Sequence, residues 1–394
     1  MSLRRRLHRL ILGRTSSRPL AVARIGVSIA VLLELGTTGT ALLRLSDAGV
    51  LHAPWLPGLL EVTQPVALAL GAAWVAGAAA FLVGWHTRLA GWVLAIALAG
   101  VVVVDQQLYS NHLYLMLVAT VLLVIGDAGS ALSLDARRSG ERAEVPAWPA
   151  FLLKAQVSIV YLYAGLAKLT PVFLSGSVMA ASLRRDGPLA VPDAWRSFEP
   201  MAVLAILAIC TELFVALALW HRRWRSAAFV VGLGLHLAIA GWLSPAPQLL
   251  IFGLLMVPLY VVFLDAPRQS RPLVWDDGCG FCAGWVRWFR RLDWLDLVRP
   301  VPLSQLSRSR LPVDEAAALE ALHLVTPFGI HRGFRAVGRT LELLPLTFAW
   351  APLLRLPPVA AIGERVYRRV AARRSCPIDG EPMPAVDSLP AARP

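Results

Sequence analysis

Long apolar runs alternate with short polar segments over the first two thirds of the chain. Eight runs are long enough, or nearly so, to cross a bilayer as helices of about 20 residues. They extend over residues 20–43, 66–85, 88–106, 111–130, 148–168, 201–220, 226–243 and 246–264. The pattern predicts an α-helical membrane bundle of about eight spans over residues 20–265, preceded by a basic tail at 1–19.

The apolar pattern changes after residue 265. Residues 266–272 read as a linker, and from 273 to 376 short apolar runs alternate with amphipathic helical segments. This alternation predicts a small soluble α/β domain of about 100 residues. Residues 377–394 are rich in Pro and Ala, and this composition predicts a disordered tail.

The composition supports a membrane protein. Hydrophobic residues make up 57% of the 394 residues, and charged residues only 16%. A soluble globule of this size has no interior large enough for that apolar share, so the lipid bilayer is the expected partner. The net charge of +13 comes from Arg clusters between apolar runs, which favours membrane-orienting charges over a nucleic-acid-binding surface.

The positions of the Arg clusters predict an orientation. They lie in the N-terminal tail and after the second, fourth and sixth apolar runs. By the positive-inside rule, the N-terminus and the domain after residue 265 are expected in the cytoplasm, with the bundle in the cell (inner) membrane. The tail lacks the small-residue cleavage site of a secretory signal, so the first run is predicted to be a signal anchor.

Two cysteines in the α/β region form the sequence CGFC, directly after an apolar strand-like run and before a helix. At a helix N-terminus, unsatisfied N–H groups and the helix dipole favour the thiolate of Cys279. The two-residue spacer lets Cys282 resolve a mixed disulfide. Half of a zinc site and an inert pair remain as alternatives, although no further ligands with zinc-finger spacing follow.

This region resembles a known family. DDGCGFC, a helix that ends in RRLD and a final ERVYRRVAARR are similar to the DCC family of thiol–disulfide oxidoreductases. The resemblance covers residues 273–376 and implies a thioredoxin-like fold and thiol–disulfide exchange. It places Asp276, Cys279, Cys282 and Asp293 on motif positions. The order Asp277-Gly278 reverses the usual Gly-acid pair before the first Cys.

The 38 basic residues include only two lysines, Lys154 and Lys168, and both lie in the fifth apolar run. Lys154 is expected to extend to the inner headgroups. Lys168 ends the run, where it either extends outward or acts as a desolvated base. Other ionisable side chains occur in or at the edge of the spans, and they favour the second reading: Glu34, His112, Glu212 and His236.

The segment around Lys168 also resembles a family. VYLYAGLAKL and a following Phe and Gly are similar to the core motif of the HTTM family, membrane domains related to vitamin-K-dependent γ-carboxylase. The resemblance covers residues 15–265. It implies that Lys168 is the base acting on a quinone or hydroquinone, and SNHLYL places a functional histidine at His112. Phe173 replaces the usual Trp, and the carboxylase's large luminal domain is missing.

These patterns predict an integral membrane redox protein, in which exchange at CGFC is coupled to a carboxylase-like quinone or hydroquinone site. The membrane site is expected around Lys168 and His112, with Glu212, His236 and Glu34 in support. The expected partners are the bilayer and a protein or small-molecule thiol. Two alternatives stay open: a maturation or export factor that modifies a secreted peptide, and a non-enzymatic membrane anchor with a degenerate thioredoxin-like module.

Overall fold

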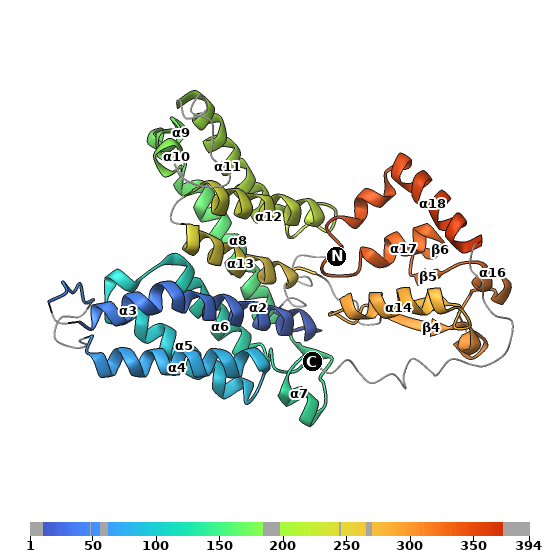
Figure 1. Ribbon diagram of the computed structural model, residues 1–394, viewed down its shortest axis with the longest axis horizontal. Helices are drawn as coiled ribbons and strands as arrows, with labels where there is room; N and C mark the ends of the chain where they lie inside the picture. The colour runs from blue at the N-terminus through green and yellow to red at the C-terminus, as the bar shows by residue number, and fades with distance from the viewer. Residues whose placement is uncertain are drawn as a thin grey trace. The chain divides into compact units, whose positions relative to one another are not determined.

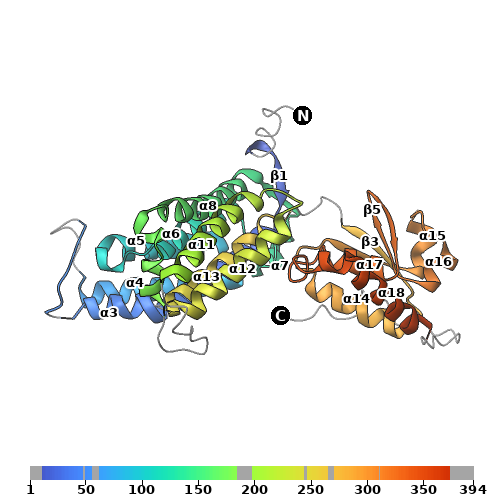
Figure 2. The ribbon, with the colours of Figure 1, turned by 90° about the horizontal axis from the view of Figure 1, so that it is seen from above.

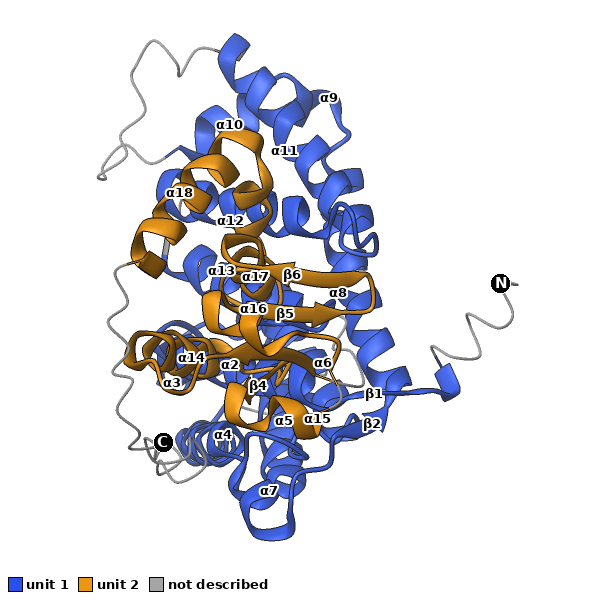
Figure 3. Ribbon diagram, turned by 90° about the vertical axis from the view of Figure 1, so that its right-hand side faces the viewer, with its two compact units in different colours: residues 1–265 blue, residues 266–394 orange. Residues whose placement is uncertain are grey.

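The computed structural model describes residues 11–47, 49–55, 62–183, 198–243, 246–264, 270–309 and 311–372. The chain divides into two compact units, Met1–Asp265 and Ala266–Pro394, which Figure 3 shows in different colours. We call the first the membrane unit and the second the thiol unit. Most of the expected basic tail, the tail at 377–394 and Cys376 lie outside the described residues.

An apolar helix occupies each of the eight predicted runs in the membrane unit (Figure 1). Within the described residues, six helices are long and apolar enough to cross a membrane, and two further apolar helices are shorter. This confirms the prediction of a multi-span helical bundle. The helices of the eight runs are α2 (Arg18–Glu34) with α3 (Thr40–Leu45), α4 (Gln64–Val83), α5 (Thr87–Val104), α6 (Asn111–Ile125), α8 (Ala147–Ala167), α11 (Phe198–Ala218), α12 (Arg225–Trp242) and α13 (Ala246–Val261).

Helix α2 packs against α4, α6 and α13, and α11 packs against α8 and α12. Small residues let these helices approach closely, as is typical of membrane bundles. A Cβ atom at Gly26 would lie 2.2 Å from the Cβ of Pro258, and one at Gly77 would lie 2.9 Å from the backbone N of Leu94. Gly26 therefore sets the distance between α2 and α13, and Gly77 sets the distance between α4 and α5.

Polar contacts tie the loops together where α4 turns into α5. Asp135, in the short helix α7 (Leu134–Ser139), accepts hydrogen bonds from the backbone N–H groups of His86 and Thr87 and from the Thr87 hydroxyl. Burial raises the pKa of Asp135, but the hydrogen bonds from Thr87 and His86 outweigh it and hold the pKa below its ordinary value. The carboxylate therefore fixes α7 to the α4–α5 turn.

The thiol unit contains a four-stranded sheet with the order β4-β3-β5-β6. The strands are β3 (Arg271–Trp275), β4 (Val298–Pro302), β5 (His323–Thr326) and β6 (Gly329–Arg332). Strand β4 is parallel to β3, whereas β5 is antiparallel to both β3 and β6. With α14 (Gly280–Leu292) joining β3 to β4, this is the thioredoxin topology, and it confirms the predicted small thioredoxin-like domain.

Both faces of this sheet are covered (Figure 2). Helices α14 and α17 (Phe334–Leu341) lie on one face, and α15 (Leu306–Ser309) and α16 (Glu315–Glu320) lie on the other. Side chains alternate along β3, since successive residues of a strand point to opposite faces. Leu273 and Trp275 pack with α14, and Val274 packs with α15 and α16. The strand is therefore buried on both sides and holds the turn that carries the cysteines.

Candidate functional site

Lys168 forms an ion pair inside the membrane unit. It is the C-cap residue of α8, and its Nζ donates hydrogen bonds of 2.6 and 2.8 Å to the two carboxylate oxygens of Glu212 on α11. A third bond of 3.2 Å goes to the backbone oxygen of Ala164. The Glu212 residue is 5% exposed. The lysine is therefore held by a carboxylate from another helix, which compensates its charge in an apolar setting.

The ion pair lies in the wall of a cavity of about 630 Å³. Its other walls are mostly apolar and come from α11, α12 and the short helices α9 (Pro171–Leu174) and α10 (Ser177–Ser182). The ring centroid of Phe173 lies 5.9 Å from Nζ of Lys168, within the range of a cation–π contact. This volume falls in the range of small-molecule sites, about 300–1,000 Å³. Representative apolar walls are Met179, Leu204, Leu207, Val231, Leu235 and Trp242.

A glycine in the YLYAGLAKL segment brings the two charges together. A Cβ atom at Gly165 would lie 2.9 Å from the Cδ2 of Leu213 and 3.6 Å from the Cβ of Glu212. The absence of a side chain lets α8 and α11 pack closely one turn before Lys168. The local sequence therefore sets the distance over which the lysine reaches the carboxylate.

A buried chain of hydroxyl and imidazole groups lies on the same face of α8. Tyr161 precedes Lys168 by about two helical turns. Its hydroxyl lies 2.6 Å from Nε2 of His236 on α12, and it also makes a hydrogen bond with the hydroxyl of Tyr260 on α13. The three residues are 3%, 4% and 1% exposed, so this polar chain is closed off from solvent.

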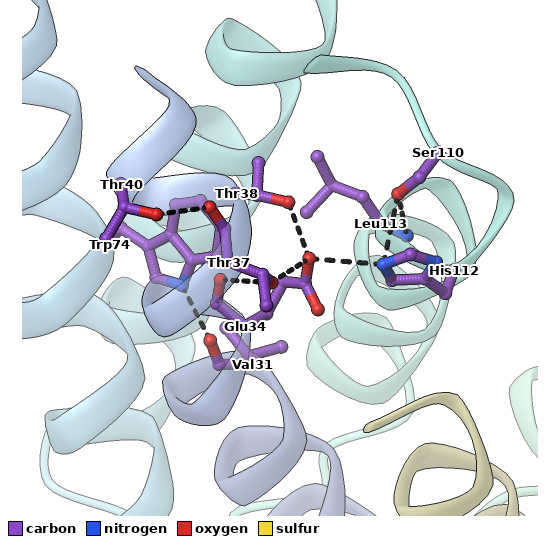
Figure 4. Close-up of polar contacts among 9 residues, drawn as sticks. All are labelled: Val31, Glu34, Thr37, Thr38, Thr40, Trp74, Ser110, His112 and Leu113. Carbon is purple, nitrogen blue, oxygen red and sulfur yellow. Dashed lines mark hydrogen bonds and ion pairs between the residues drawn. The ribbon is translucent and has the colours of Figure 1, made fainter. Parts of the chain in front are cut away.

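Glu34 and His112 form a second carboxylate–base pair (Figure 4). Glu34 is fully buried, and its Oε1 lies 3.1 Å from Nε2 of His112 at the start of α6. The same oxygen accepts hydrogen bonds from the hydroxyls of Thr37 at 2.8 Å and Thr38 at 2.5 Å. Both threonines belong to η1 (Leu35–Gly39), a π-helical turn between α2 and α3. Turns of this kind are frequent at functional sites.

The five membrane residues expected in one site are therefore distributed over three groups. Within the described residues, no hydrogen bond or ion pair joins one group to another. The groups are Lys168 with Glu212, His112 with Glu34, and His236 with Tyr161 and Tyr260. Only the first of them lines the large cavity.

Tyr161 and Tyr260 were not among the residues expected in the site. Tyr161 stands in the motif that carries Lys168, two turns before it, and that spacing is the signal that could have found it. Tyr260 is a single tyrosine in an apolar run, and nothing in its neighbourhood marks the face on which it lies.

In the thiol unit, Cys279 is the N-cap residue of α14 and Cys282 lies in its first turn. The turn before them is closed by Asp276, whose carboxylate accepts a 3.0 Å hydrogen bond from the N–H of Gly278. Asp276 therefore shapes the loop that presents the cysteines. The residues are 3% (Cys279) and 7% (Cys282) exposed, so only a small part of each reaches solvent.

The reversed order Asp277-Gly278 has a structural reason. Oδ2 of Asp277 accepts a 2.5 Å hydrogen bond from the hydroxyl of Ser304, and Oδ1 accepts one of 3.1 Å from its N–H. Ser304 lies in the short helical turn directly after β4, so this side chain fastens the cysteine loop to the neighbouring strand. The turn thus remains closed with the acidic residue one position earlier.

Asp293, the last of the four motif positions, lies away from the cysteines. This residue lies at the other end of the 13-residue helix α14, about 20 Å from the cysteine end. Its oxygens accept hydrogen bonds of 2.9 and 2.7 Å from the N–H groups of Leu297 and Val298. Asp293 therefore supports the turn into β4 and does not support the thiols. Within the described residues, no group of three or more His, Cys, Asp or Glu side chains could hold a metal ion.

The fold and these sites define a multi-pass membrane protein that carries a thioredoxin-like domain with a paired-cysteine motif. Comparison with protein families agrees with this class. The family model of the HTTM domain matches residues 14–266, and the model of the DCC1-like thiol-disulfide oxidoreductase matches residues 273–376. The chain belongs to the HTTM domain family and continues into a DCC1-like domain, as the two resemblances indicated. No curated protein and no solved structure matched the chain.

Proposed function

We propose that the protein couples thiol–disulfide exchange at Cys279 and Cys282 to a lipid-soluble quinone or hydroquinone bound beside Lys168. One observation carries the membrane half of the proposal: the pair Lys168–Glu212 lies in the wall of an otherwise mostly apolar cavity of about 630 Å³. The DCC1-like match and the position of the cysteines at the start of α14 support the thiol half.

The ion pair suits proton transfer to or from a weakly acidic hydroxyl. When Nζ of Lys168 gives a proton to Glu212, the amine becomes neutral and can accept a proton from a ligand hydroxyl in the cavity. The charge that returns to the lysine is then balanced by the deprotonated ligand oxygen, while Glu212 stays neutral until it releases its proton. The apolar walls and the Phe173 ring suit the ring and tail of a quinone, since such cavities hold apolar ligands through a few convergent polar groups.

The two sites are expected on different membrane faces, because the positive-inside rule places the thiol unit in the cytoplasm and the end of α8 outside. A carrier that diffuses in the bilayer joins sites that do not meet, and a lipid-soluble quinone has this property. A membrane-impermeant thiol reagent tests the orientation in intact cells. Labelling of Cys279 from outside would overturn this part of the proposal.

Photo-crosslinking tests the membrane site. A short-chain quinone that carries an azide is added to the full-length protein in nanodiscs, and labelled peptides are mapped by mass spectrometry. We expect labels on α11 and α12. Leu207→Trp, which fills the cavity, should lower the labelling by about tenfold, which corresponds to about 1.4 kcal/mol of binding energy.

The matched control is Leu217→Trp. Leu217 lies on the same helix and is 66% exposed, against 54% for Leu207, but it does not line the cavity. Equal labelling in both variants would contradict a ligand site at Lys168. Alkylation of Cys279 tests the proposed thiol–disulfide exchange. If Cys279 reacts no faster than an ordinary thiol near pH 7, this activity is contradicted, and the alternative of a non-enzymatic membrane anchor is favoured.

A further inference from the structure

A second cavity lies inside the thiol unit, beside Cys282. Its volume is about 300 Å³, and α14, α17 and α18 (Pro357–Ala372) form its walls. Aromatic rings contribute much of the lining, and no charged side chain of the described residues faces it, although the helices around it are rich in arginine. The lining includes Phe281, Cys282, Trp285, Phe334, Val366 and Tyr367.

Helix α18 covers this cavity, and its outer side is exposed. None of its residues is buried, and Ile362 and Val366 are 61% and 53% exposed. Its Tyr367 hydroxyl accepts a 2.9 Å hydrogen bond from the N–H of Leu322, which precedes β5 and also lines the cavity. Gly363 of α18 packs against the ring of Phe334, and Cys282 itself lines the cavity, so a ligand bound there lies next to a thiol.

Conversion of the Cys279–Cys282 dithiol into a disulfide needs an oxidant that accepts two electrons. The four cysteines of the sequence are Cys210, Cys279, Cys282 and Cys376, and they include one C-x-x-C pair. Residues 262–270 alone join α13 to β3, which tethers the thiol unit directly to a membrane helix. The short linker keeps the thiol unit near the bilayer, in which a lipid-soluble ligand is concentrated.

We propose that the cavity beside Cys282 binds the ring of a membrane quinone, and that this quinone oxidises the Cys279–Cys282 dithiol directly. The proposal rests on the thiol–disulfide function proposed above. The two S–H bonds break and one S–S bond forms, while the two electrons and two protons pass to the quinone, which leaves as the hydroquinone. The aromatic walls stack on the ring, and the lack of charge suits a neutral ligand.

Anaerobic kinetics test this proposal. The full-length protein is reduced, reconstituted in nanodiscs and mixed with a fully ring-substituted benzoquinone that carries a short isoprenoid tail, to which thiols cannot add at a free ring position. Hydroquinone formation is followed by absorbance and disulfide formation by mass spectrometry. We expect one hydroquinone for each disulfide formed.

A bulky residue at the mouth of the cavity should block the reaction. Val366→Trp is expected to slow hydroquinone formation by about tenfold or more, as a loss of about 1.4 kcal/mol produces. Ile362→Trp is the matched control, because this exposed residue lies one turn earlier on α18 and does not line the cavity. Its rate should stay within about twofold of the unmodified protein, as for most surface substitutions.

Three other results would distinguish failure of the cavity as a quinone site from failure of the proposed thiol–disulfide exchange. Equal rates in the two Trp variants would overturn the cavity as the quinone site. A rate that responds to Lys168→Ala and not to Val366→Trp would place the reaction at the membrane cavity. If the reduced protein exchanges with a soluble disulfide but forms no hydroquinone, direct oxidation is wrong while thiol–disulfide exchange stands.

Discussion

Two carboxylates on membrane helices and one carboxylate at a turn of the thiol unit find their hydrogen-bond partners differently. In the membrane unit, Glu212 pairs with Lys168 and Glu34 with His112, partners that lie on other helices and far away in the sequence. In the thiol unit, the Asp293 carboxylate accepts hydrogen bonds from backbone N–H groups only four and five residues away.

The solvent around each unit explains this difference. A membrane helix uses its backbone N–H groups internally, so a carboxylate within it needs a donor from another side chain. The turns of an α/β unit leave backbone groups free, and a nearby residue can use them. A lost partner should therefore cost more in the membrane unit than in the thiol unit.

Lys168→Ala should give the largest effect on stability. Removal of one partner leaves the Glu212 carboxylate buried without its counter-charge, which costs about 3–5 kcal/mol. Unfolding in mixed micelles, followed by circular dichroism, measures the loss. The double variant Lys168→Met/Glu212→Leu should regain most of it, because both charges are then absent. A double variant as unstable as Lys168→Ala would contradict the ion pair as the cause.

His112→Ala should cost less, about 1–3 kcal/mol, the usual range for a lost buried hydrogen bond. The Thr37 and Thr38 hydroxyls still donate to Glu34 in this variant. The same unfolding measurement applies. Thr38→Val in the His112→Ala background should then add to the loss, and a triple variant with Thr37→Val should approach the cost of Lys168→Ala. No added loss would show that the hydroxyls do not satisfy the carboxylate.

Asp293→Asn should destabilise the thiol unit by about 1 kcal/mol, because the amide still accepts a hydrogen bond but loses the charge that strengthens it. Hydrogen exchange of the amides of Leu297 and Val298 reports this locally. We expect faster exchange at these two amides and unchanged alkylation of Cys279. A changed alkylation rate of Cys279 would show that Asp293 does influence the thiols.

The smallest effect is a pH dependence at His323. Burial lowers the pKa of this imidazole; a hydrogen bond to the Ala321 carbonyl opposes the shift and Arg332 adds to it. The folded state then binds fewer protons than the unfolded state, so stability falls as the pH drops through about 6.5, the ordinary pKa of histidine. Exchange of the β5 amides, corrected for intrinsic rates, should accelerate at pH 5.5. His323→Gln should flatten this dependence, and an unchanged slope would rule out His323 as its source.

The sequence was sufficient for the helices, because a long apolar run directly predicts a membrane helix. Its alternating pattern after residue 273 also predicted a small α/β unit, and the resemblance to the DCC family implied that this unit is thioredoxin-like. The pairing of Lys168 with Glu212 depends on how α8 packs against α11, and the spacing along one chain carries no information about that contact. The motif also does not show how far Asp293 lies from the cysteines, because motif positions that are close in sequence stand at opposite ends of one helix.

The π-helical turn η1 changes how the first membrane span tolerates insertions and deletions. A π turn accommodates one residue more than an α-helix needs over the same length, so α2 and α3 continue in nearly the same direction on either side of it. Loss of residue 35 or 36 would let the span continue as a regular α-helix. Thr37 and Thr38 would then follow Glu34 by two and three residues instead of three and four, which changes how their hydroxyls reach its carboxylate.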